Sequence, residues 1–127
     1  MPEITKPQVR IYHNPRCSKS RATLEILQAH DLDLDIIPYQ QQPPDNRTLK
    51  KLAAMLNVDA RGIIRVGDAD YRQLGLDNEN LSEADLFSAL ADNINLLQRP
   101  IVIRDEQAII GRPPANVRKL LPESFNV

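Results

Sequence analysis

This chain is almost without cysteine, since Cys17 is the only one among its 127 residues. One cysteine cannot form an internal disulfide. An excess of charge of one sign is also lacking, because the formal net charge is −1, so no global field favours nucleic acid or an anionic membrane as a partner. The apolar runs are only a few residues long and fall far short of a membrane span. These absences leave a soluble globular protein with one thiol.

The length fits a single domain over residues 1–127, and such a chain can bury a core without disulfides or metal. The first residues, Met1-Pro2-Glu3, have neither the basic region nor the apolar stretch of a secretory signal. Together with the missing disulfide, this start leads us to expect a cytoplasmic protein.

Strand and helix patterns alternate at both ends of the chain. Residues 8–13 and 32–38 are predicted strands, and residues 18–29 between them have the apolar spacing of a helix. A β-α-β unit of this size normally gives two parallel strands. Toward the C-terminus, residues 101–104 and 107–110 predict an antiparallel hairpin, and a closing helix is expected to begin at Pro113-Pro114.

The middle of the chain is predicted to be helical. Leu49, Leu52, Ala53 and Leu56 share one helix face, with Asp45 or Asn46 as the cap. Residues 82–85 indicate a capping box, and shorter helices are expected at 60–64 and 68–74. The whole order predicts an α/β, thioredoxin-like fold, in which a four-stranded mixed sheet is flanked by helices and a helical insert separates strands two and three.

Cys17 stands where a reactive thiol is expected, because segment 14–16 ends the first strand and a helix begins directly after the cysteine. A side chain at a helix N-terminus faces unpaired N–H groups and the positive end of the helix dipole. Both favour the thiolate, which is the nucleophile. Ligand sites of open α/β sheets also lie beyond the carboxyl ends of strands. Nearby basic residues add positive charge: Arg16, Lys19 and Arg21.

Three familiar thiol chemistries do not fit the residues around Cys17. A dithiol redox site needs a second cysteine where Ser20 stands, and a phosphatase loop needs an arginine where Thr23 stands. A zinc site has only Cys17, His13 and His30 as soft candidates, and no complete ligand set is evident. What remains is a nucleophilic cysteine whose adduct is resolved by an external thiol.

An oxyanion substrate would need cations around it, and the arginine fork matches tetrahedral oxyanions best. Arg99 begins the third strand beside Pro100, Arg112 follows the fourth strand, and Arg65 is a third candidate. Spacing alone does not bring them to Cys17. From the topology, we also expect the Arg99–Pro100 peptide bond to be cis.

Almost the whole chain resembles the glutaredoxin-coupled arsenate reductase family. The resemblance is carried by YHNPRCSKSR at 12–21, YQQQPP at 39–44, IIR at 63–65, YRQLGL at 71–76, RPIV at 99–102 and GRP at 111–113. It implies the thioredoxin-like fold with a helical insert. It also implies a set of site residues: Cys17 as nucleophile, His13 as the group that helps to keep it ionised, Arg65, Arg99 and Arg112 as the oxyanion-binding triad, and Asn14, Ser18 and Ser20 as hydrogen-bonding residues of the loop.

The activity implied by this resemblance is the reduction of arsenate to arsenite, a step of arsenic detoxification. The Cys17 thiolate attacks arsenic, glutathione attacks the adduct, and glutaredoxin removes the glutathione. The expected partners are therefore arsenate, glutathione as co-substrate and glutaredoxin, with no bound metal or organic cofactor, no nucleic acid and no membrane.

Two other interpretations stay open. One is a thiol oxidoreductase of the same family with another substrate, such as a glutathione mixed disulfide, because one cysteine suffices for monothiol exchange. The other is an Spx-type redox regulator that binds RNA polymerase, in which the three arginines would have no role.

Overall fold

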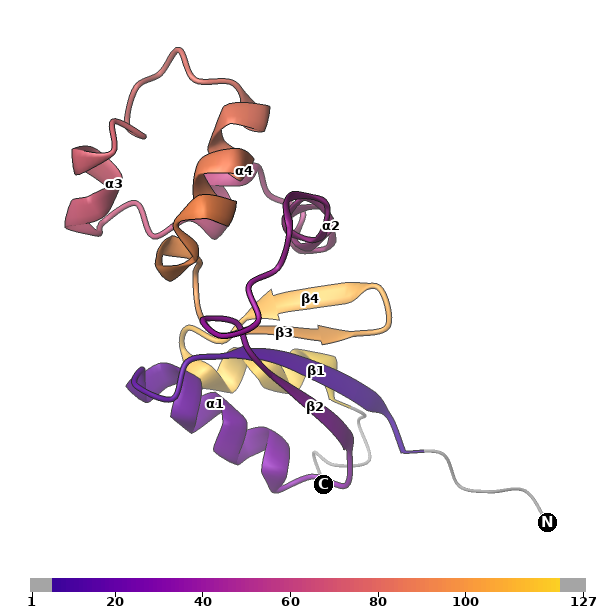
Figure 1. Cartoon of the computed structure of the whole chain (residues 1–127). Coiled ribbons are helices and arrows are strands. Elements are labelled where there is room, and N and C mark those ends of the chain that lie inside the picture. The colour runs from indigo at the N-terminus through magenta and orange to yellow at the C-terminus, as the bar shows by residue number, and fades with distance from the viewer. Residues whose placement is uncertain (1–5, 122–127) are drawn as a thin grey trace. The chain divides into compact units, whose positions relative to one another are not determined.

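The computed structural model describes residues 6–121, which fall into two compact units (Figure 1). One unit holds the described residues up to Pro38 and from Arg99 onward, and the other spans Tyr39–Gln98. The second unit is inserted into the sequence between strands two and three of the first, as expected. The prediction of a single domain over residues 1–127 stays a prediction.

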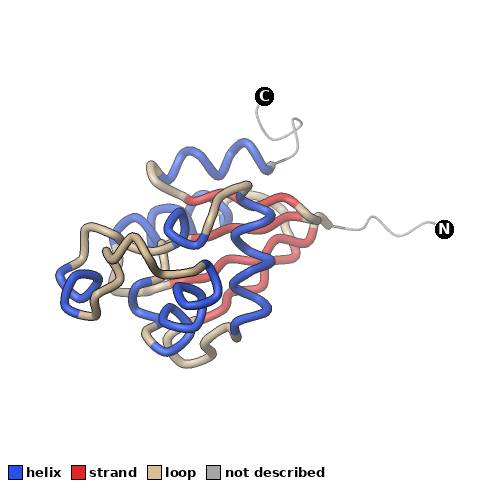
Figure 2. Tube along the Cα trace, turned by 90° about the horizontal axis from the view of Figure 1, so that it is seen from above, coloured by secondary structure: helices blue, strands red, loops and turns tan. Residues whose placement is uncertain are grey.

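The first unit is built on a four-stranded sheet, whose strands are red in Figure 2, and the strand order is β2-β1-β3-β4. Its strands are β1 (Gln8–His13), β2 (Asp33–Pro38), β3 (Ile101–Arg104) and β4 (Gln107–Ile110). β1 runs parallel to β2 and antiparallel to β3, while β3 and β4 form an antiparallel hairpin. The predicted four-stranded mixed sheet of an α/β, thioredoxin-like fold is confirmed.

Two helices pack on one face of this sheet, namely α1 (Ser18–Gln28) and the 3-10 helix η3 (Pro114–Leu120) (Figure 1). Because side chains alternate along a strand, Val9 and Ile11 of β1 point to the same face. They form a buried core with Leu27, Val102, Val117, Leu120 and Leu121. Val117 and Leu120 are three residues apart, a spacing that a 3-10 helix places on one side.

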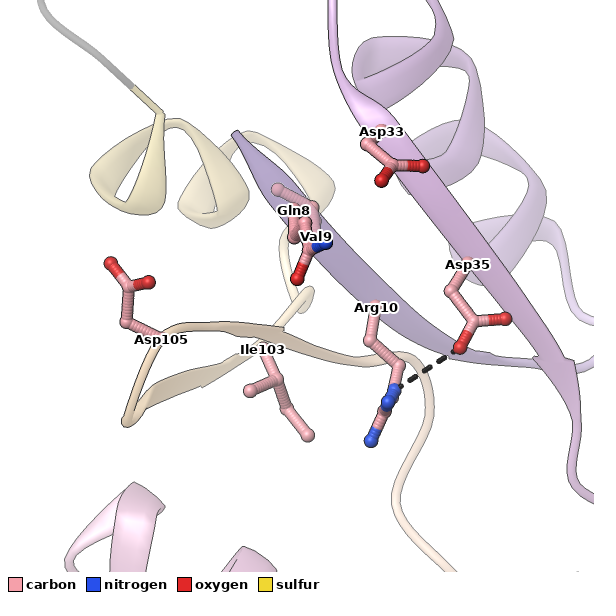
Figure 3. Close-up of a pocket in the computed structure, with 7 residues that line it drawn as sticks. All are labelled: Gln8, Val9, Arg10, Asp33, Asp35, Ile103 and Asp105. Atoms are coloured by element: carbon pink, nitrogen blue, oxygen red, sulfur yellow. Dashed lines mark hydrogen bonds and ion pairs between the residues drawn. The ribbon is translucent and has the colours of Figure 1, made fainter. Parts of the chain in front are cut away.

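Polar side chains of β1, β2 and the β3–β4 hairpin line a pocket (Figure 3). Within it the Arg10 Nε donates to Asp35 Oδ2 at 3.3 Å. The other lining residues are Gln8, Val9, Asp33, Ile103 and Asp105. None of these side chains is a thiol, so this pocket is not where thiol chemistry takes place.

The second unit consists of helical segments joined by loops. They are α2 (Asn46–Leu56), η1 (Ala60–Ile63), α3 (Ala69–Gln73), α4 (Glu83–Asp92) and η2 (Ile94–Leu96). Asp45 caps α2 by accepting from the Thr48 N–H at 2.8 Å, and the predicted Ser82–Asp85 capping box is present at α4. The segment predicted as a helix at 60–64 is the 3-10 helix η1, whereas η2 has no counterpart among the predicted elements.

Every helix within residues 6–121 is too short or too polar to span a bilayer. The two longest described helices, α1 and α2, have 11 residues each. At the usual helical rise such a helix is about 16 Å long, roughly half the thickness of a bilayer core.

Candidate active site

The turn between β1 and α1 places Cys17 at the N-cap of the helix. Cys17 has an extended backbone, with φ −96° and ψ 122°. Its N–H donates to the Asn14 carbonyl at 3.0 Å, which closes the turn, and its carbonyl accepts the Arg21 N–H at 3.0 Å, which is the first helical bond. The predicted strand–turn–cysteine–helix arrangement is therefore present, and the thiol stands at the helix N-terminus.

Ser20 connects the end of β1 to the first turn of α1. Its Oγ accepts the Asn14 N–H at 3.0 Å and is hydrogen-bonded to His13 Nδ1 at 2.7 Å. Ser20 is fully buried, and His13 and Asn14 are only 8% and 6% exposed. Water therefore has little access to these groups, and the Ser20 hydroxyl is the partner that satisfies both neighbours.

Replacing Ser20 with alanine should destabilise the fold by about 1–3 kcal/mol, because two buried polar groups lose their partner. Urea unfolding monitored by circular dichroism measures the change in the free energy of unfolding. Ser18→Ala is the matched control, since Ser18 is exposed in the same first turn and the same helix preference applies to both sites. Equal free energies of unfolding for the two variants would contradict this role of Ser20.

Two further bonds fix the chain before Cys17. Asn14 Oδ1 accepts the Arg16 N–H at 3.0 Å, and the Arg21 Nη1 donates to the Pro15 carbonyl at 2.8 Å. The Asn14 side chain thus holds the turn, and the Arg21 side chain ties α1 back to it. The hydrogen-bonding role of the exposed Ser18 stays a prediction.

The thiol of Cys17 is only partly exposed, and several groups donate hydrogen bonds to its sulfur. Burial raises the pKa of Cys17. Donation from the Ser20 backbone, the Arg99 side chain and the Lys19 backbone, together with the charge of Arg99, outweighs burial, so the net pKa is below the usual value. The predicted helix N–H groups are those of Lys19 and Ser20. The thiolate, which is the reactive form, is therefore favoured.

Alkylation of Cys17 by iodoacetamide should follow a pH profile whose midpoint lies below that of a free cysteine thiol, about 8.5. The sign follows from the lowered pKa of Cys17: at any pH between the two midpoints, more of the folded protein than of the unfolded chain is thiolate. The measurement compares the native protein with the urea-unfolded protein, which serves as its own control. A native midpoint at or above the unfolded one would contradict the prediction.

His13 is not among the groups that lower the pKa of Cys17. Burial lowers the pKa of His13 first, and the charge of Arg21 lowers it further, so the neutral imidazole is favoured. Its connection to Cys17 runs through Ser20, whose side chain binds His13 and whose backbone N–H binds the sulfur. The catalytic role of His13 stays a prediction.

Two of the three predicted arginines lie in the unit that holds Cys17. The Arg99 side chain donates to the Cys17 sulfur, and the Arg112 Nη1 donates to the Arg99 carbonyl at 3.2 Å. Both the Arg99–Pro100 and the Arg112–Pro113 peptide bonds are cis, and the first of these was expected from the topology. Arg112 is exposed, and among the described residues no carboxylate forms an ion pair with it.

Arg65 belongs to the second unit. Its Nη1 donates to Asp68 Oδ2 at 3.0 Å, and its N–H donates to the Leu96 carbonyl at 2.7 Å. The spacing of three residues between Arg65 and Asp68 is the sequence signal from which this ion pair could have been predicted. The place of Arg65 in an oxyanion-binding triad stays a prediction.

Across residues 6–121 no group of three or more His, Cys, Asp or Glu side chains is placed to hold a metal ion. His30 follows the C-terminal end of α1, where its Nδ1 is hydrogen-bonded to the Ile26 carbonyl at 2.7 Å. Cys17 precedes the first residue of the same helix, roughly 20 Å away along its axis. His30 therefore cannot join Cys17 in a zinc site.

Known proteins resemble this chain over most of its length. A family model described as the ArsC family matches residues 12–120. The chain is 44% identical over 116 residues to a protein of Neisseria meningitidis serogroup A named arsenate reductase, covering 91% of this chain and 99% of that protein. It is 42% identical over 115 residues to the Escherichia coli K12 protein named Uncharacterized protein YfgD, covering 90% and 97%. The solved structure described as arsenate reductase from Vibrio cholerae superposes with a TM-score of 0.89 at 38% identity, covering 92% of this chain and 100% of that one.

Proposed function

Because this chain belongs to the ArsC family, we propose that it is an arsenate reductase in which Cys17 is the nucleophile. One arrangement carries the proposal: Cys17 lies at the N-cap of α1, and its sulfur accepts a hydrogen bond from the Arg99 side chain, which helps to lower the pKa of the thiol. This brings a thiolate and a cation that suits oxyanions into direct contact. The relatives named arsenate reductase support arsenate as the substrate.

In the first step the Cys17 thiolate attacks arsenic in bound arsenate. A sulfur–arsenic bond forms, one arsenic–oxygen bond breaks, and the oxygen leaves as water after protonation. Arsenic remains in its pentavalent state. The positive charge of Arg99 and Arg112 stabilises the negative charge on the arsenate oxygens during the attack. Arg65 is proposed as the third cation of this set.

The electrons come from two external thiols, because the chain has no second cysteine. Glutathione displaces a second oxygen from arsenic, which again leaves as water. The thiolate of glutaredoxin then attacks the glutathione sulfur, so a glutaredoxin–glutathione disulfide forms and the electron pair of the broken sulfur–arsenic bond stays on arsenic. Arsenic is thereby reduced to the trivalent state. Hydrolysis of the remaining bond to Cys17 releases arsenite and the free thiol.

The test is the production of arsenite from arsenate by the purified full chain with glutathione and glutaredoxin. We expect turnover only when both thiols are present. Omitting each thiol in turn tests the donors separately from the substrate. No arsenite above the level of the reagents alone would refute the proposal.

A glutathionylated peptide offered in place of arsenate tests the alternative of monothiol exchange. A partly exposed thiolate is the one requirement of that reaction, and Cys17 meets it. We expect slower turnover of the peptide than of arsenate. The reverse order would assign the chain to mixed-disulfide reduction.

A further inference from the structure

A buried threonine joins the helix of Cys17 to the end of the hairpin. Thr23 lies in the second turn of α1 and is fully buried. Its Oγ1 donates to the Lys19 carbonyl at 2.8 Å, and the same oxygen lies 3.4 Å from the Gly111 carbonyl oxygen. The second distance is too long for a strong hydrogen bond, so it records close packing of the Thr23 side chain against the Gly111 backbone.

Gly111 makes this close packing possible. A Cβ on Gly111 would lie 2.6 Å from Thr23 Oγ1, 3.1 Å from Thr23 Cγ2 and 2.8 Å from Pro100 Cγ. These distances are too short for carbon contacts, and Pro100 is a rigid ring, so α1 or the chain at Gly111 would have to move. The Gly111 N–H also donates to the Pro100 carbonyl at 2.9 Å. Glycine is thus required by the approach of two neighbours.

Three segments meet at this contact: α1, Pro100 before β3 and Gly111 after β4. Each of them leads into a group of the candidate active site. The Lys19 carbonyl that Thr23 binds belongs to the first turn of α1, and the Lys19 N–H lowers the pKa of Cys17. Pro100 follows Arg99, and Gly111 precedes Arg112. A shift at this contact would therefore move the sulfur relative to two guanidinium groups.

We propose that Thr23 and Gly111 are positioning residues that set the separation between the Cys17 sulfur and the guanidinium groups of Arg99 and Arg112. They act through α1 and the ends of β3 and β4, and neither residue needs to touch substrate. The inference deepens the proposed function, and only its prediction for kcat with arsenate rests on that function. The contact between Cys17 and Arg99 exists in the free protein and can be measured without arsenate.

Gly111→Ala is the direct test, with Gly67→Ala as its matched control. A Cβ at Gly67 meets nothing within 4 Å, so that variant carries the same change of residue without crowding. In Gly111→Ala we expect the pH midpoint of Cys17 alkylation to rise, because the sulfur loses part of its contact with Arg99. We expect kcat for arsenate to fall about 10-fold to 100-fold, as a misplacement of about 1 Å does elsewhere. Gly67→Ala should keep the wild-type midpoint.

A size-compensating pair separates positioning from simple loss of stability. Thr23→Ala/Gly111→Ala removes the two threonine atoms that the new Cβ would meet and leaves its 2.8 Å contact with Pro100 Cγ. We expect this double variant to recover part of the alkylation midpoint that Gly111→Ala loses. Thr23→Val keeps the side-chain shape and removes the hydroxyl, and it should raise the midpoint by a smaller amount.

Circular dichroism and urea unfolding establish that each variant is folded before its thiol is titrated. Should Gly111→Ala not fold, the double variant and Thr23→Val carry the test. Folded variants that keep the wild-type midpoint would overturn the inference. A wild-type chain that makes no arsenite, but whose midpoint rises in Gly111→Ala, would refute the proposed function and leave the positioning role standing.

Discussion

Replacing Cys17 with serine is expected to lower arsenate turnover by at least about a thousandfold. A hydroxyl is far less acidic than a thiol, so the N–H groups of α1 and the Arg99 guanidinium cannot hold serine as an anion near neutral pH. Because the chain has no other cysteine, no second thiol can replace Cys17. Arsenite formation with saturating glutathione and glutaredoxin is the measurement.

The serine variant should remain folded, because serine is close to cysteine in size and Cys17 lies at the N-cap, where its side chain is partly exposed and not buried in the core. Serine is also a favoured N-cap residue. Equal or higher stability in urea is therefore the expected control result. Turnover within about tenfold of the wild type in a folded Cys17→Ser chain would show that the nucleophile lies elsewhere.

Arg99→Ala is expected to lower kcat/KM for arsenate about 100-fold to 1000-fold, the usual cost of removing a donor that stabilises developing charge. The same change acts on the nucleophile. Burial raises the pKa of Cys17, and the side chain and charge of Arg99 are among the groups that lower it. Without Arg99 the pKa of Cys17 rises, so the thiolate fraction at a fixed pH below it falls. Two measurements detect these effects: kcat/KM for arsenate, and the pH midpoint of Cys17 alkylation.

Two arginine variants serve as controls for Arg99→Ala. Arg99→Lys keeps the charge but loses the planar fork, so we expect a pKa of Cys17 close to the wild type and a kcat/KM between those of the wild type and Arg99→Ala. Arg118→Ala removes an exposed arginine of η3 from the same unit and should change neither quantity. An alkylation midpoint in Arg99→Ala equal to that in Arg118→Ala would contradict a direct contact between Arg99 and the sulfur.

Local patterns are sufficient to predict most elements of both units. The strand expected at 8–13 matches β1, and the hairpin split by Asp105-Glu106 matches β3 and β4. The Ser82–Asp85 capping box fixes the start of α4. These signals involve residues within a few positions of one another, so a single segment carries the information. The 3-10 helix η2 lacks a side-chain cap, so no such signal predicts it.

The candidate site is predictable only in part. A helix N-terminus after a strand is a local feature, and it identifies Cys17 and the N–H groups that favour its thiolate. The bond of Ser20 to His13 and Asn14 is not evident from the sequence, because it depends on how the turn folds back on the first turn of α1. The contact between Thr23 and Gly111 joins residues 88 positions apart, and no pattern in the chain reveals it.

A lone cysteine at a helix start and the periodicity of apolar residues are properties of neighbouring residues, so local patterns specify the reactive group and most of the strands and helices around it. Which cation meets that sulfur depends instead on long-range packing. Pairing β1 with β3 brings Arg99, which is distant from Cys17 in the sequence, to the start of α1. A pairing between distant strands depends on the packing of the whole sheet against α1 and η3, and no single segment of the sequence encodes that packing.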